Sequence, residues 1–144
     1  ILPQIQHHVK FMVIGKCPDY IREQYKNKGN VVFTGRVDNL VEYVRKSQIF
    51  LSPILYGTGI KTKILEAMSM EVPVVTNDIG AEGIMARDGK ELWIRNDSAT
   101  IAEQVDYLLD HYDEAVSVAE VGRELVEKKY EWNNIYKEFG KFFK

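Results

Sequence analysis

The chain has 144 residues and a formal net charge of -2, with acidic and basic residues mixed along its length. This length fits one domain with a sizeable core, and the lack of a basic block disfavours nucleic-acid binding, because affinity for a phosphate backbone needs clustered Lys and Arg. The single cysteine, Cys17, excludes an internal disulfide, and no apolar run reaches the about 18 residues of a membrane-spanning helix.

Five short apolar runs alternate with segments of helical periodicity. The runs are FMVIG, NVVFTG, QIFLSP, VPVVTN and ELWI, beginning at residues 11, 30, 48, 72 and 91. Their apolar residues are consecutive rather than alternating with polar ones, which is typical of strands that are covered on both faces. We therefore predict five buried strands.

Two of the helical segments lie in the first third of the chain. The segment at 18–28 has Pro18 near its start, where a missing backbone N–H costs nothing. The segment at 38–47 begins with Asp38, which is a favourable N-cap.

Two further helices are predicted at 60–70 and 100–110. The second begins with Thr100 and Glu103 at the spacing of a capping box. Each segment places its apolar residues on one face. These residues are Ile60, Ile64, Ala67 and Met68 in the first helix, and Ile101, Val105, Leu108 and Leu109 in the second.

Alternation of buried strands with helices predicts an α/β fold, a Rossmann-like parallel sheet flanked by helices, with right-handed crossovers. The pattern becomes purely helical after residue 95, and we find no repeat or linker that would divide residues 1–144. Ligands of such sheets bind outside the carboxyl ends of the strands. The functional loops are therefore expected at 15–18, 35–37, 53–59 and 77–83.

The stretch YGTGIKTK, which begins at Tyr56, resembles a phosphate-binding loop but fits neither of two well-known motifs. A Walker A loop needs Lys directly after its second glycine, and here Ile60 separates Gly59 from Lys61. The dinucleotide fingerprint Gly-x-Gly-x-x-Gly fails at its third glycine, which is Thr62 here.

A more general anion site is still expected at this loop. Glycines let the backbone approach an anion closely, and a helix start offers free N–H groups at a positive dipole end. We expect the N–H groups of Ile60, Lys61 and Thr62 to face the anion, with Lys61 and Lys63 adding positive charge.

Glu66 admits two interpretations. At about 100° per residue it lies roughly opposite the apolar stripe centred on Ile64. Its carboxylate could accept hydrogen bonds from two ligand hydroxyls, as ribose recognition requires. Alternatively it forms a solvated ion pair with Lys63, worth about 0.2–0.5 kcal/mol. The spacing leaves both interpretations open.

Taken together, the stretch GTGIKTKILEAMSMEVPVVTNDIGAEGI resembles the donor-binding half of the group 1 retaining glycosyltransferases of GT-B fold. That family typically reads Gly-x-Gly-x-Lys/Arg-x-Lys-x-x-Glu-Ala-Met, then a strand with Pro-Val-Val, then a Gly-x-Glu-Gly loop. KFMVIGKCP, VVFTGRVDNLVEYVRKSQIFLSP, ATIAEQVDYLLDH and VEKKYEWNNIYKEF are similar to other parts of the family in the same order. The resemblance covers about residues 9 to 143.

The resemblance implies roles for individual positions. Glu66 matches the acid that holds the donor ribose, the loop from Gly57 to Thr62 matches the turn that holds the diphosphate, and Gly15 matches a close-approach glycine near the nucleotide. The segment 35–37 matches the one that lies along the nucleobase. The implied substrate-binding residues are Gly15, Gly35, Arg36, Val37, Gly57, Thr58, Gly59, Ile60, Lys61, Thr62 and Glu66.

In such enzymes the sugar leaves the nucleotide diphosphate with retained configuration, and positive groups stabilise the departing diphosphate. Lys61 and Lys63 are the candidates for that role here, no other catalytic residue is assigned, and the resemblance implies neither a cofactor nor a metal. Many relatives carry Glu eight positions before the acid matched by Glu66, where this chain has Thr58. Glu82, in the GAEG loop, lies near the implied sugar site.

The resemblance also implies a larger enzyme. We expect residues 1–144 to be one nucleotide-sugar-binding domain, truncated at its N-terminus, with the acceptor-binding domain and a first, mid-sheet strand absent. Its partners would be the nucleotide-sugar donor and that acceptor domain, and we expect inefficient transfer alone. Polysaccharide biosynthesis in the cytoplasm, with peripheral association of the full enzyme at the inner membrane face, fits the family.

Other residues are expected to be structural. Cys17 is more simply a small loop residue than a reactive thiol, and His7 and His8 are expected at the frayed end of a helix. The stripe of Trp132, Tyr136, Phe139 and Phe143 predicts core packing or a partly exposed apolar face. The alternative function is a non-enzymatic interaction module of receiver type, which the strand ends disfavour because they lack its carboxylates.

Overall fold

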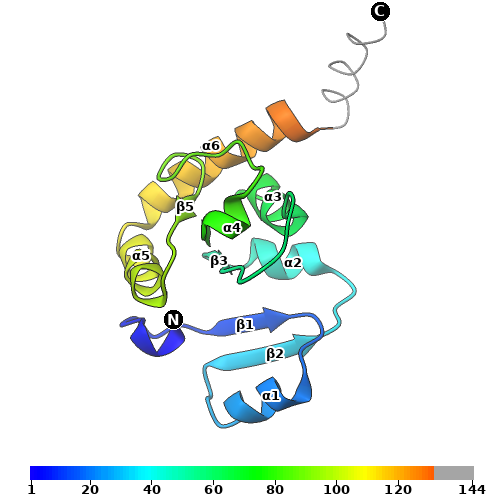
Figure 1. The fold of residues 1–144 in the computed structure, drawn as a ribbon. Coiled ribbons are helices and arrows are strands. Elements are labelled where there is room, and N and C mark those ends of the chain that lie inside the picture. The colour runs from blue at the N-terminus through cyan, green and yellow to red at the C-terminus, as the bar shows by residue number, and fades with distance from the viewer. Residues whose placement is uncertain (132–144) are drawn as a thin grey trace, which may run out of the picture.

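The computed structural model describes residues 1–131 (Figure 1). A short 3-10 helix, η1 (Leu2–Gln4), precedes the first strand. The strands are β1 (Phe11–Ile14), β2 (Val31–Gly35), β3 (Phe50–Ser52), β4 (Val74–Thr76) and β5 (Trp93–Ile94). The α-helices are α1 (Asp19–Tyr25), α2 (Leu40–Arg45), α3 (Thr62–Ser69), α4 (Asp78–Ala81), α5 (Ser98–Asp110) and α6 (Tyr112–Tyr130). Each of the five predicted strands is present, and the chain after residue 95 is largely helical as far as Tyr130. The predicted burial is wrong for β1, β2 and β3, whose residues are only half-buried, whereas all of β4 is buried.

All strand pairs are parallel, which confirms the predicted fold class. The strands form two hydrogen-bonded sheets. In the first, β1 pairs with β2 (Figure 1). The second contains β3, β4 and β5 in that order. Within residues 1–131, β1 does not pair with β3.

The strand β4 lies at the centre of the fold because both of its faces are buried. Val74 belongs to the core cluster that contains Ile64 of α3, whereas Val75 belongs to the cluster that contains Ile101 of α5. Successive side chains of a strand point to opposite faces, so α3 and α5 cover opposite faces of the second sheet. This double burial explains why the sequence around β4 is a continuous apolar run.

Helix α6 contributes to both clusters. Ala115, near its start, packs with the α5 cluster, and Val126, near its end, packs with the α3 cluster. Between them Gly122 passes close to the sheet: a Cβ added there would lie 2.6 Å from the carbonyl oxygen of Glu91, just before β5. The helix therefore crosses from one face to the other at a glycine.

Three predicted helix starts or N-caps are displaced by one to three residues. The N-cap of α2 is Asn39 rather than Asp38, and its side chain accepts a hydrogen bond from the N–H of Glu42. The N-cap of α5 is Asp97 rather than Thr100, and it accepts from the N–H of Ala99 and Thr100. In both cases another cap-forming residue lies close by in the sequence, and periodicity alone does not choose between them. Helix α3 begins at Thr62, so Ile60 lies outside it.

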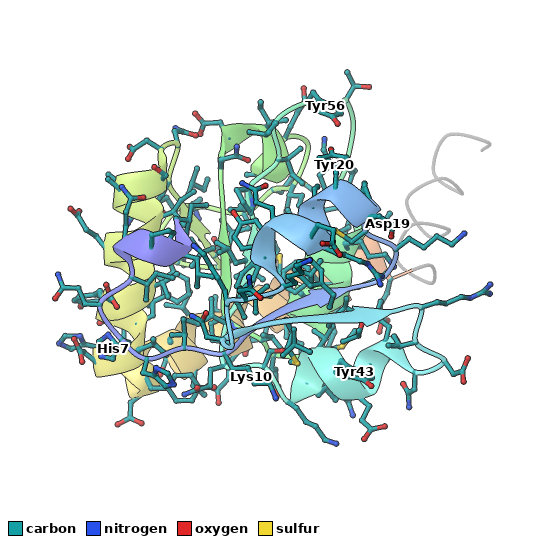
Figure 2. All side chains as sticks on the ribbon, turned by 90° about the horizontal axis from the view of Figure 1, so that it is seen from below. His7, Lys10, Asp19, Tyr20, Tyr43 and Tyr56 are labelled. Carbon is teal, nitrogen blue, oxygen red and sulfur yellow. The ribbon has the colours of Figure 1, made fainter. Side chains whose placement is uncertain are left out.

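The N-terminal segment is bound to α5, so the predicted frayed helix end at His7 is wrong. Asp106 accepts hydrogen bonds from the backbone N–H groups of Gln6 and His7. The His7 ring lies with Nδ1 2.7 Å from Asp106 and Nε2 2.9 Å from Asp110 (Figure 2). These hydrogen bonds to Asp106 and Asp110 raise the pKa of His7.

Among the helices of residues 1–131, none combines the length and apolar composition that crossing a bilayer requires. The aromatic stripe of Trp132, Tyr136, Phe139 and Phe143 lies outside the described residues.

The Gly122 crossing gives a first prediction. In Gly122→Ala the new methyl group meets a backbone oxygen that no side-chain rotation can move. Because the obstacle is backbone, we expect a cost in the upper part of the about 1–3 kcal/mol of overpacking; alanine gains about 1 kcal/mol over glycine in a helix, so the net loss in the free energy of unfolding should be about 1–2 kcal/mol. Urea unfolding measures it. Gly29→Ala, where nothing lies within 4 Å of the new atom, is the matched control, and a Gly122→Ala variant as stable as the native chain would contradict this account.

A second prediction concerns pH. Because the pKa of His7 is raised on folding, its contribution to stability is complete below its unfolded pKa of about 6.5 and is lost as the pH rises through the folded value. Burial opposes charge on Asp106, but hydrogen bonds from Gln6 and His7 outweigh this and lower its pKa, so its contribution is lost only as the pH falls through that lowered value.

We therefore expect His7→Ala to destabilise the chain more at about pH 5.5 than at about pH 8.5. Urea unfolding at both values measures the difference. His8→Ala removes the neighbouring exposed imidazole, which makes none of these contacts, and should show no such pH dependence. An equal loss at both pH values for His7→Ala would contradict the prediction.

Candidate functional site

The loop that follows β3 is fastened to the end of β4 by side-chain hydrogen bonds. The Asn77 side chain accepts from the N–H of Ile54 at 3.2 Å and donates to the carbonyl of Ile54 at 2.7 Å. It also caps α4 by accepting from the N–H of Gly80. The Thr76 hydroxyl donates to the carbonyl of Ser52. Asn77 thus fixes where the loop from Gly57 to Thr62, the glycine loop, begins. From the sequence alone Asn77 is only a polar residue at the end of a strand.

The glycine loop, from Gly57 to Thr62, contains two residues with positive φ. Gly57 and Gly59 have φ values of +130° and +76°, which residues with a Cβ rarely adopt. The exposed Leu55 and Tyr56 precede them, and Tyr56 lies at the outer edge of the molecule (Figure 2). The two glycines turn the chain into the start of α3.

The first turn of α3 carries the free N–H groups, but they are shifted from the expected positions. The N-cap is Lys61, and the first hydrogen bonds to its carbonyl come from Ile64 and Leu65. The helix therefore presents the N–H groups of Thr62 and Lys63 at its open end. Ile60 is 47% exposed rather than part of the apolar stripe, because the turn at Gly59 places it in the loop.

Lys61 folds back over the loop. Its ammonium donates to the carbonyl of Gly59 at 2.6 Å and lies 3.7 Å from the Glu82 carboxylate. Its side chain is 16% exposed. Glu82 follows α4, so this ion pair joins the glycine loop to the GAEG loop.

The second lysine of the loop is paired along α3. Lys63 Nζ lies 2.8 Å from the Glu66 carboxylate, and both side chains are well exposed. The ion pair expected from the spacing is therefore formed. Its partners face solvent at the first turns of α3, where a ligand could reach the Glu66 carboxylate.

A second group of site residues lies at the ends of β1 and β2. The N–H of Gly15 donates to the carbonyl of Gly35 at 2.9 Å, and both glycines have positive φ. Arg36 follows as an exposed side chain and Val37 as a half-buried one. No hydrogen bond or ion pair among residues 1–131 joins this group to the glycine loop.

Arg22 of α1 adds to this second group and was not singled out from the sequence. A Cβ at Gly35 would lie 3.8 Å from its Nη2, so its guanidinium lies against the end of β2. Its Nε is buried without a hydrogen-bond partner among the described residues. Only the tertiary packing of α1 on β2 reveals this, because nothing in the local sequence distinguishes Arg22 from a surface arginine.

Cys17 and His111 lie in places that packing and local hydrogen bonds explain. Cys17 is half-buried in the loop after β1, and His111, between α5 and α6, stacks on Tyr107 and hydrogen-bonds its carbonyl. Within residues 1–131 no group of three or more His, Cys, Asp or Glu side chains is arranged to hold a metal ion.

A model of the family "Glycosyl transferases group 1" matches residues 1–111. Two curated relatives match over about the same length. An "uncharacterized 44.6 kDa protein in cps region" of Klebsiella pneumoniae is 30% identical over 106 residues, which are 67% of this chain and 27% of the relative. The "putative teichuronic acid biosynthesis glycosyltransferase TuaC" of Bacillus subtilis (strain 168) is 28% identical over 107 residues, 72% of this chain and 26% of the relative.

Among solved structures, Alr3699/HepE of Anabaena, crystallised in complex with UDP, superposes with a TM-score of 0.87 at 15% identity. The superposition covers 99% of this chain and 42% of that protein. The superposition shows that the two proteins share a fold. The chain spans about a quarter of the length of the two curated relatives. On the strength of the family match, the chain belongs to the group 1 glycosyltransferases.

Proposed function

We propose that this chain is the donor-binding domain of a retaining glycosyltransferase and binds a nucleotide-diphosphate sugar. The observation that carries the proposal is the turn at Gly57 and Gly59, whose positive φ values open the backbone in front of α3. A diphosphate placed there would accept hydrogen bonds from the N–H groups of Thr62 and Lys63, at the positive end of the helix dipole. The UDP complex of the structurally similar HepE supports this choice of ligand.

Other residues would hold the remaining parts of the donor. Glu66, one turn into α3, would exchange its Lys63 ion pair for hydrogen bonds from the ribose hydroxyls. Gly15 and the segment from Gly35 to Val37 would lie along the nucleobase, where the two glycines leave room for close approach.

The proposed chemistry is electrostatic. As the sugar departs with retained configuration, negative charge develops on the diphosphate, and Lys61, Lys63 and the helix N–H groups would stabilise it without a metal. Thr58 stands where many family members have Glu, so the sugar would be held here without that carboxylate. The acceptor would bind another domain of a longer enzyme.

Family membership sets aside the alternative of a receiver-like interaction module. The printed names of the relatives, from a cps region and from teichuronic acid biosynthesis, support a surface polysaccharide as the product. We propose that the full enzyme works in the cytoplasm, with peripheral association at the inner membrane face.

Calorimetric titration with UDP, GDP and ADP tests the proposal. We expect one diphosphate to bind in the micromolar-to-millimolar range, and Glu66→Ala to weaken that binding by about 1–3 kcal/mol, the cost of losing a hydrogen-bonded carboxylate. The matching nucleoside without phosphate should be weakened equally, because Glu66 would contact the ribose.

Lys63→Ala is the matched control. It breaks the same ion pair but keeps the carboxylate, so it should not weaken nucleoside binding, although it should weaken binding of the diphosphate. If no diphosphate binds at millimolar concentration, either to this chain or to one extended at its N-terminus, the donor-binding proposal is wrong.

A further inference from the structure

Glu82 pairs with Lys61, the same lysine that the diphosphate of the proposed ligand would contact. The two residues are 21 positions apart, and the loops that carry them also touch through Ile60: a Cβ at Gly83 would lie 3.0 Å from the Ile60 side chain. Gly83 has a φ of +75°, which permits this approach. The ammonium of Lys61 therefore already has a negative partner in the ligand-free chain.

The two partners of this ion pair differ in exposure. The Lys61 side chain is 16% exposed and hydrogen-bonds Gly59, whereas the Glu82 side chain is 55% exposed. At 3.7 Å the carboxylate lies beyond hydrogen-bond distance of the ammonium. Glu82 is thus the loosely held partner, which can turn into water while Lys61 stays in place.

We propose that Glu82 is a displaceable counterion of Lys61, which the diphosphate of the donor replaces on binding. This inference rests on the proposed function, because it concerns the same anion site. Glu82 neutralises Lys61 when the site is empty and moves away from it when the phosphate oxygens arrive. It also lowers the affinity for any anion there, since a carboxylate beside the site repels the incoming negative charge.

The displacement should leave a measurable electrostatic signature. Removing the carboxylate removes a competitor for Lys61, and the size of the gain should be that of an exposed ion pair, about two- to fivefold in affinity. Because exposed charges are screened, the gain should shrink between about 0.05 M and about 0.5 M salt.

The test compares the native chain with Glu82→Gln, which keeps the side-chain shape, by calorimetry with UDP or whichever diphosphate the native chain prefers. We expect Glu82→Gln to bind the diphosphate about two- to fivefold more tightly at low salt and the matching nucleoside unchanged. Glu103→Gln, which removes an exposed carboxylate of α5, controls for net charge.

The gain should also shrink when Glu82→Gln is made in a Lys61→Met chain, because that chain has no ammonium at position 61 for Glu82 and the diphosphate to compete for. Equal or weaker diphosphate binding by Glu82→Gln would overturn the inference. That result is expected if the Glu82 carboxylate instead holds Lys61 in the orientation that the ligand needs. If the native chain binds a diphosphate in a Glu66-dependent way and Glu82→Gln does not improve it, the inference fails alone. If neither chain binds, it falls with the proposed function.

Discussion

The burial of β4 on both faces is the constraint on which the rest of the structure depends. Val74 and Val75 each lie in a different core cluster, and Pro73 and Thr76 beside them are also buried. A shift of one residue would exchange the two faces and unpack both clusters at once. The register of β4 with β3 is therefore fixed. Hydrogen bonds from Thr76 to Ser52 and from Asn77 to Ile54 then fix the residues that lead into the glycine loop.

The first sheet is held differently. No residue of β1 or β2 is fully buried, and Arg22 of α1 lies against the end of β2. Within residues 1–131 no strand ladder joins the β1-β2 pair to the sheet of β3, β4 and β5, so helix packing rather than strand pairing sets how the Gly15–Gly35 pair lies relative to the glycine loop.

The sequence predicts the parts of this fold that local patterns control. Continuous apolar runs bounded by turn residues located all five strands, although only β4 is buried along its whole length and β1, β2 and β3 are half-buried. The glycines at 57 and 59 are where the backbone needs positive φ. Helix starts were less predictable because Asp38 and Asn39, or Asp97 and Thr100, offer competing caps. Contacts between distant loops, such as Lys61 with Glu82 or His7 with Asp106, depend on how helices pack and have no local signature.

The candidate site has two kinds of positive group, lysine ammonium groups and backbone N–H groups at the start of α3. They differ in whether a carboxylate already faces them. Lys61 and Lys63 each already face a carboxylate, so what either contributes to binding is the difference between two ion pairs, which is small at an exposed site. The N–H groups at the start of α3 have no counterion to give up, and the turn orients them before a ligand arrives. If the donor-binding proposal holds, affinity for a diphosphate depends more on the conformations of Gly57 and Gly59 than on the number of lysines nearby.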